Sequence, residues 1–139
     1  MLIMKGGINR ISEEKERIDV VVNNAGYGFT GALEETSMNE IKALFETNFF
    51  GALRVMQAVI PMMRKQRRGK IVNITSVGGR IPFPLNSIHH ATKFALEGLS
   101  ESIQYELEPF GIKIILIEPG TVGSNFQEYE DACKGIRSH

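Results

Sequence analysis

The residues from 18 to 28 read Ile18-Asp19-Val20-Val21-Val22-Asn23-Asn24-Ala25-Gly26-Tyr27-Gly28, and this stretch is the strongest indication of the fold class. The run 18–23 is short, rich in β-branched residues and followed by a polar, glycine-rich loop, so it predicts a buried β-strand. Similar runs stand at 70–74 and 112–117. Strands that are apolar along most of their length are typical of a parallel sheet covered on both faces.

Helical segments separate these three strands. The first begins with the pattern of a capping box at Ser37-Met38-Asn39-Glu40 and continues with apolar residues at spacings of three and four to Met63, where Gly51 and Pro61 can bend or shorten it. A second helix is expected from about residue 88 to 107, and 13–17 reads as the end of a short helix. The expected apolar side of the second helix consists of Ala91, Ala95, Leu99, Ile103 and Leu107.

The order of elements is therefore a partial helix and then strand, helix, strand, helix, strand. Helical connections of this length between strands imply right-handed βαβ crossovers and a parallel sheet. We expect an α/β fold in a single domain over residues 1–139. The residues after Gly120 show no convincing pattern.

The composition limits the classes of function. The chain has 139 residues, of which 42% are hydrophobic and 23% charged, as in an ordinary globular domain. The 16 Lys and Arg balance the 16 Asp and Glu, so no net charge favours nucleic acid or an anionic membrane. Cys133 is the single cysteine, which excludes an intrachain disulfide and suits a reducing compartment. With no membrane-spanning run and no signal peptide at 1–7, we expect a cytoplasmic protein without nucleic-acid or membrane partners.

The loops after the predicted strands are where chemistry is expected. Ligands of open parallel sheets bind beyond the carboxyl ends of the strands. The loops 23–28, 75–79 and 118–124 are all small, polar and glycine-rich, which lets a ligand approach the backbone. Three such loops at corresponding positions are hard to explain by turn formation alone.

These loops resemble those of the short-chain dehydrogenase/reductase family. The family's N-N-A-G motif stands at 23–26, its N-x-x-G helix pattern at 48–51 and its P-G motif at 119–120, with Ser124 at the downstream threonine position. The segment 93–99 resembles the branch that includes steroid and retinol dehydrogenases. The resemblance implies a partial Rossmann-like, doubly wound parallel sheet whose three strands correspond to the fourth, fifth and sixth of the family.

The family's catalytic positions fall on Asn48, Ser76, His89 and Lys93. The interval from Ser76 to position 89 is 89 − 76 = 13, as in the family. The resemblance implies hydride transfer between NAD or NADP and a ketone or secondary alcohol. Ser76 would hydrogen-bond the substrate oxygen, Lys93 would bind the nicotinamide ribose, and Asn48 would complete a proton relay through water. The implied cofactor-binding residues are Asn23, Ala25, Gly26, Lys93, Pro119, Gly120, Val122 and Ser124.

The sequence departs from the family in two ways. His89 stands where the family has its proton-transferring tyrosine; imidazole can act near neutral pH, but it is shorter than phenol and a Lys93 cation lowers its pKa. We therefore expect a severe loss of hydride transfer. No glycine-rich cofactor turn precedes Ile18, and the chain ends soon after Ser124. We expect a fragment. By the resemblance, the acidic or basic residue that selects NAD or NADP would belong to the absent amino-terminal part, so the sequence does not indicate which of the two cofactors is used.

Simpler interpretations remain open for each candidate. Asn23 and Ser76 can be ordinary turn residues, Asn48 a satisfied polar group in a helix, and His89 a plain residue of a helix N-terminus. We expect no metal site, because adjacent histidines do not face one ligand. The basic run 64–68 fits a solvated helix end better than a nucleic-acid site.

A second hypothesis is a non-catalytic module. The small residues Ala91, Ala95, Gly98 and Ser102 would let another helix approach closely, and the resemblance implies a homo-oligomer formed through the two long helices. The enzyme hypothesis requires cofactor binding, whereas a module requires only self-association or binding to a related chain. A coding fragment with no independent function is the third alternative.

Overall fold

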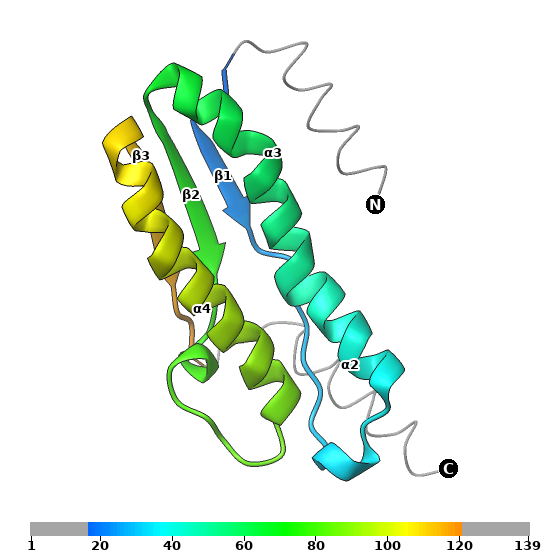
Figure 1. Ribbon diagram of the computed structural model, residues 1–139. Helices are drawn as coiled ribbons and strands as arrows, with labels where there is room; N and C mark the ends of the chain where they lie inside the picture. Colours follow the sequence, from blue (N-terminus) through cyan, green and yellow to red (C-terminus); the bar gives the residue numbers. More distant parts are fainter. Residues whose placement is uncertain (1–16, 121–139) are drawn as a thin grey trace.

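The computed structural model describes residues 17–120 (Figure 1). Helices and strands alternate along this part of the chain, joined by short single-turn helices. In chain order the elements are β1 (Val20–Asn23), η1 (Leu33–Glu35), α2 (Met38–Phe45), the π-helical turn η2 (Glu46–Phe50), α3 (Gly51–Gln66), β2 (Gly69–Ile74), η3 (Val77–Gly79), α4 (Ser87–Leu107), η4 (Glu108–Phe110) and β3 (Ile112–Ile117).

The three strands form one parallel sheet in the order β1-β2-β3. This arrangement confirms the α/β fold and the three predicted strands. The first strand begins at Val20 rather than at Ile18, because the backbone of Ile18 is bonded to a side chain instead of a neighbouring strand. The Ile18 amide donates to Gln66 Oε1, and Gln66 Nε2 donates back to the Ile18 carbonyl.

Helices α3 and α4 both pack on the same face of the sheet (Figure 1). The core between these layers is apolar and consists of Ala52, Met56, Val59, Met63, Ile71, Leu96, Leu107 and Ile112. The opposite face carries the aligned row Val22, Val72 and Ile115, in which Val22 is 56% exposed. Within residues 17–120 the sheet is thus covered on one face, and the expectation of two covered faces is not met there.

The first predicted helix is continuous from Met38 to Gln66 but contains one π-helical turn. Ser37 caps α2 as predicted, because its hydroxyl accepts from the Glu40 amide and the Glu40 carboxylate accepts from the Ser37 amide. The π-helical turn η2 then widens the helix, and α3 begins at Gly51. Pro61 is accommodated inside α3.

Helix α4 agrees with its predicted length, but its buried side differs from the prediction. Ala91 is exposed, whereas the residues fully buried on α4 are mostly polar: His90, Thr92, Lys93, Leu96, Glu97, Ser100 and Leu107. Leu107 is buried, and Leu99 and Ile103 pack against the core as predicted, so the prediction was wrong at Ala91 and incomplete because it followed apolar side chains only. The polar side chains are buried because they bond to neighbouring loops and strands. None of the helices in the described part of the chain is long and apolar enough to cross a membrane.

Candidate active site

The candidate site lies where the strands end. The loops that follow β1, β2 and β3 meet at the same end of the sheet (Figure 1). The Val77 amide donates to the Pro119 carbonyl over 3.1 Å, and the Thr75 amide donates to the Ile117 carbonyl over 2.8 Å. These bonds join the second loop to the third, as the topology of a parallel sheet requires.

Asn48 ties the first loop to the helices. It lies in the π-helical turn η2 and is 2% exposed. Its Oδ1 accepts from the Tyr27 amide over 3.0 Å, and its Nδ2 donates to the Tyr27 carbonyl over 2.8 Å and to Thr92 Oγ1 over 3.1 Å. Asn48 is thus a well-satisfied polar group, as the simpler interpretation held, and it also stands at the meeting point of the loop and α4.

Gly26 brings the loop into contact with two predicted site residues. A Cβ atom on Gly26 would lie 3.3 Å from Asn48 Oδ1 and 3.3 Å from Lys93 Nζ. That distance is tighter than ordinary van der Waals contact. The backbone at Gly26 therefore approaches both side chains closely because it has no side chain of its own.

Lys93 is a buried residue and not a surface lysine. It is 6% exposed, and its ammonium donates to the carbonyl of Ile74, the last residue of β2, over 3.1 Å. Burial lowers its pKa to about 8, and the negative charge of Glu97 opposes that shift. At neutral pH Lys93 is therefore a positive charge held inside the site.

His89 is half-buried and neutral at pH 7. Burial lowers its pKa to about 4, helped by the charge of Lys93, while a hydrogen bond to the Tyr27 carbonyl acts in the opposite direction. The 3.3 Å contact of Nδ1 with that carbonyl requires the proton on Nδ1. The lowering by Lys93 agrees with the sequence analysis, but burial, the larger cause, could not be seen from spacing.

Ser76 forms the turn that follows β2. It is half-buried, and its Oγ accepts from the Gly78 amide over 3.0 Å. This is the turn role that the simpler interpretation gives it. The same turn places the serine at the carboxyl end of β2, two residues after Ile74, whose carbonyl holds Lys93.

The predicted cofactor-binding residues divide into three groups. Ala25 and Gly26 are exposed in the first loop. Pro119 and Gly120 belong to the third loop and lie beside Val77 of the second loop. Asn23 instead bonds to the neighbouring strand, where its Nδ2 donates to Asn73 Oδ1 over 2.8 Å. Val122 and Ser124 lie outside the described residues, and so does Cys133. The short helix expected to end at 13–17 also lies outside them, apart from residue 17.

Several residues of the site have no motif in the sequence analysis. Thr92 bonds to Asn48, and Glu97, 3% exposed, stands one turn after Lys93. Arg80 Nη2 lies 3.1 Å from Glu97 Oε2, although the carboxylate oxygens have no well-directed hydrogen bond within residues 17–120. The spacing of four between Lys93 and Glu97 was a signal that could have identified this pair.

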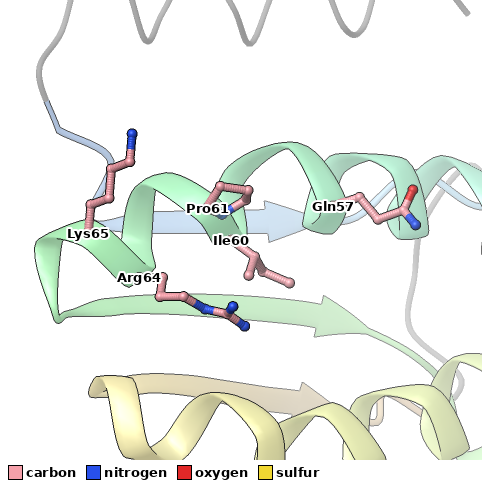
Figure 2. A pocket seen from close by; sticks show the side chains of 5 residues that line it. All are labelled: Gln57, Ile60, Pro61, Arg64 and Lys65. Atoms are coloured by element: carbon pink, nitrogen blue, oxygen red, sulfur yellow. The ribbon is translucent and has the colours of Figure 1, made fainter.

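The surface shows one open hollow away from these residues. It has a volume of about 630 Å³ and lies on the outer side of α3, lined by Gln57, Ile60, Pro61, Arg64 and Lys65 (Figure 2). None of the candidate site residues lines it. Among the residues that the structure describes, no three His, Cys, Asp or Glu side chains gather in a way that could hold a metal ion.

Comparison with known proteins identifies relatives of this chain. It is 43% identical over 125 residues to the 3-ketodihydrosphingosine reductase of Bacteroides thetaiotaomicron, covering 90% of this chain and 46% of the relative. It is 47% identical over 110 residues to human retinol dehydrogenase 8, covering 79% of this chain and 35% of the relative. The chain thus spans half or less of the length of these two relatives.

Solved structures agree with this result. The structure of ElxO with NADP bound matches with a TM-score of 0.85 at 33% identity, over 94% of this chain and 54% of that one. NAD+-bound xylitol dehydrogenase matches with a TM-score of 0.83 at 29% identity, over 89% of this chain and 48% of that one. The family model for short chain dehydrogenases matches residues 4–134, and the chain therefore belongs to the short-chain dehydrogenase family.

Proposed function

We propose that this chain supplies part of a single NAD(P)-binding domain of an oxidoreductase that transfers a hydride between the nicotinamide and a ketone or secondary alcohol. The observation that carries the proposal is the convergence of Gly26, Asn48 and the buried Lys93 at the carboxyl ends of the strands. The similar structures with bound NADP and NAD+ support the cofactor class without deciding between the two. Its single cysteine suits a reducing compartment such as the cytoplasm.

The residues present fit such a cofactor. Among the described residues, the one hydrogen bond made by the Lys93 ammonium is to the Ile74 carbonyl, so two of its three N–H groups are available to ribose hydroxyls. Gly26 leaves open the space beside Nζ that a side chain would fill. Ala25, Pro119 and Gly120 would line the approach to this space, with Val122 and Ser124 beyond the described part.

Each catalytic candidate has a distinct role in the proposal. A bound nicotinamide supplies or accepts the hydride. Lys93 would orient the ribose, and Ser76 would donate a hydrogen bond to the substrate oxygen. His89 would exchange the proton at that oxygen, and Asn48 would fix the loop and the helix that hold the other groups.

The protonation state of His89 favours one direction. A histidine with a pKa of about 4 is neutral at pH 7, so it can accept a proton from an alcohol but rarely holds one to donate to a ketone. Histidine at this position is therefore expected to impair carbonyl reduction more than alcohol oxidation.

Titration of the chain with NADH and NADPH, followed by nicotinamide fluorescence, tests the proposal. The chain has no Trp, so no indole signal overlaps. We expect saturable binding of at least one cofactor, weakened at least about tenfold in Lys93→Gln, the cost of a lost charged hydrogen bond. The matched variant Lys113→Gln changes an exposed lysine of β3 and should bind normally. If the folded chain shows no binding at a cofactor concentration of about 1 mM, its Kd is weaker than that value and the proposal is refuted.

A non-catalytic module is the second candidate function. It is favoured by the outer side of α4, where Ala91, Gly98 and Ser102 are exposed and a Cβ on Gly98 would meet no atom within 4 Å. A second copy could pack closely there. Sedimentation equilibrium should then show a dimer that Ser102→Lys disrupts and that Asn39→Lys, on the exposed side of α2, leaves intact. A monomer at all concentrations would exclude homo-oligomerisation.

A further inference from the structure

His90 is a buried histidine with no role in the proposed reaction. It lies in the first turn of α4, next to His89, and is 5% exposed. Its Nδ1 lies 2.8 Å from the Gly78 carbonyl oxygen, and the Phe83 amide donates to its Nε2 over 2.8 Å. One ring therefore binds two backbone groups that are five residues apart in the connection between β2 and α4.

These partners fix the state of the ring. A carbonyl oxygen can only accept, so Nδ1 must carry a proton. A backbone amide can only donate, so Nε2 must lack one. His90 can make both bonds only as the neutral Nδ1–H tautomer.

Gly78 makes this contact possible. A Cβ on Gly78 would lie 2.6 Å from His90 Nδ1, a distance at which atoms must shift. The Gly78 amide also donates to Ser76 Oγ, so the glycine held by His90 is the one that holds the serine hydroxyl. A displacement of the imidazole would thus reach Ser76 through a single residue.

Phe83 connects the same ring to the apolar segment 81–85. The Phe83 ring centroid lies 5.4 Å from that of His90, yet Phe83 is 50% exposed. The segment is held at its far end as well, because the Gly31 amide donates to the Leu85 carbonyl over 2.8 Å. At its near end Arg80 pairs with Glu97, Glu101 and Glu118. His90 supplies the buried anchor between these two ends.

We propose that His90 is a positioning residue that sets the turn of Ser76 and the segment 81–85 relative to His89 and Lys93 on the same helix. A role of this positioning in substrate recognition rests on the proposed function. The anchor itself is independent of that function, because it consists of contacts within the chain. Its recognition role would be to present exposed apolar side chains beside the proton-handling residues at a fixed distance.

The first test is the state of the ring in the unchanged chain. Nitrogen-15 NMR of labelled histidine at pH 7.5 should show His90 as the Nδ1–H tautomer, with a proton on Nδ1 and a bare Nε2. The Nε2–H tautomer, or a mixture of both in which Nε2–H predominates, would overturn the proposal.

The second test uses amide hydrogen exchange at Phe83 and Gly78. His90→Phe removes both bonds. It should speed exchange about tenfold at the Phe83 amide, which loses its acceptor, and also at the Gly78 amide, because releasing the Gly78 carbonyl loosens the turn in which that amide donates to Ser76 Oγ. Asn places its amide nitrogen near the position of Nδ1, whereas Gln places its oxygen near that of Nε2. His90→Gln should therefore restore protection at Phe83 directly, and His90→Asn, by holding the Gly78 carbonyl, should restore the turn of Ser76 and with it protection of the Gly78 amide.

This selective rescue separates positioning from a general structural role. The Tyr27 amide, which donates to Asn48, should keep its protection in all three variants, and His89→Asn is the matched control at the neighbouring histidine. Equal losses at Tyr27, Phe83 and Gly78, or unchanged exchange at Phe83 in His90→Phe, would contradict the proposal. All measurements are made without cofactor, so a failure of cofactor binding would count against the proposed function and not against this anchor.

Discussion

At the scale of single residues, the site depends on the burial of two basic groups. His89 and Lys93 stand one helical turn apart and share a face of α4. Both pKa values are lowered, chiefly by burial, to about 4 and about 8. Their spacing was visible in the sequence, whereas the depth at which they lie depends on the loop of Gly26 and Tyr27 folding over them. For this reason the identity of the candidates was predictable and their protonation was not.

The charge of Lys93 should be detectable at His89. In an NMR titration, His89 is expected to titrate far below the 6.5 of an ordinary histidine, near 4. Lys93→Gln should raise this pKa, because the lysine cation disfavours imidazolium. A His89 pKa above 6, or no change in Lys93→Gln, would contradict the geometry described for this pair.

Replacing His89 by tyrosine tests the proposed proton transfer. Once the parts that its longer relatives have in addition are joined to this chain, His89→Tyr is expected to raise the rate of ketone reduction by roughly 100-fold, the factor associated with misplacing a group by about 1 Å. The rate is measured as NADPH or NADH consumption with a panel of ketones. His89→Phe, which can exchange no proton, should show no gain. A rate in His89→Tyr at or below that of the unchanged chain would argue against a proton-transfer role at position 89.

At the scale of elements, the sequence predicted regular structure well and the buried side of α4 only in part. The capping box at Ser37 and the strand 112–117 are confirmed, because both depend on local patterns. The π-helical turn η2 and the buried Glu97 depend on contacts with distant segments. Hydropathy ranks such polar residues as exposed, so the predicted stripe was displaced toward Ala91.

Two glycines next to or within α4 should respond in opposite ways to the same change. Gly78→Ala is expected to destabilise the protein by about 1–3 kcal/mol, because the new Cβ would overlap the His90 ring. Gly98→Ala should stabilise it by up to about 1 kcal/mol, since a Cβ there meets no neighbour and alanine favours the helix. Chemical denaturation measures both. A stable Gly78→Ala variant would mean that η3 can move away from α4.

At the scale of the whole molecule, the described chain is a helix layer on one face of a three-stranded sheet. The core beneath α3 and α4 was expected from the apolar runs. The exposed row of Val22 and Ile115 on the other face was not expected, because parallel strands this apolar are normally covered by helices on both faces of the sheet. The pattern of a strand records that its faces are apolar, but it does not record which segment covers them.

The stability of the molecule should depend on pH through His89. The folded-state pKa is about 4 and the unfolded one is near 6.5, so the unfolded chain binds the proton more readily between these values. The free energy of unfolding should therefore be unaffected by this group above pH 6.5 and fall as the pH drops below it, by about 2 kcal/mol at pH 5. Urea denaturation above pH 6.5 and at pH 5 gives the loss of unfolding free energy between the two conditions. This loss should be smaller by the same amount in His89→Asn than in the unchanged chain. Equal losses in the two chains would mean that His89 is solvated in the folded chain.

We propose that the strand ends of this chain form an NAD(P) site around Gly26, Asn48 and Lys93. Mapping by two-dimensional amide NMR, with NADP+ and then NAD+ added to labelled chain, tests it most directly. The amides of Gly26, Tyr27 and Lys93 should shift in a saturable manner, together with Val77 beside Pro119, while those on the outer side of α3 stay in place. Shifts confined to the hollow at Gln57 and Arg64, or no saturable shift at all, would contradict it.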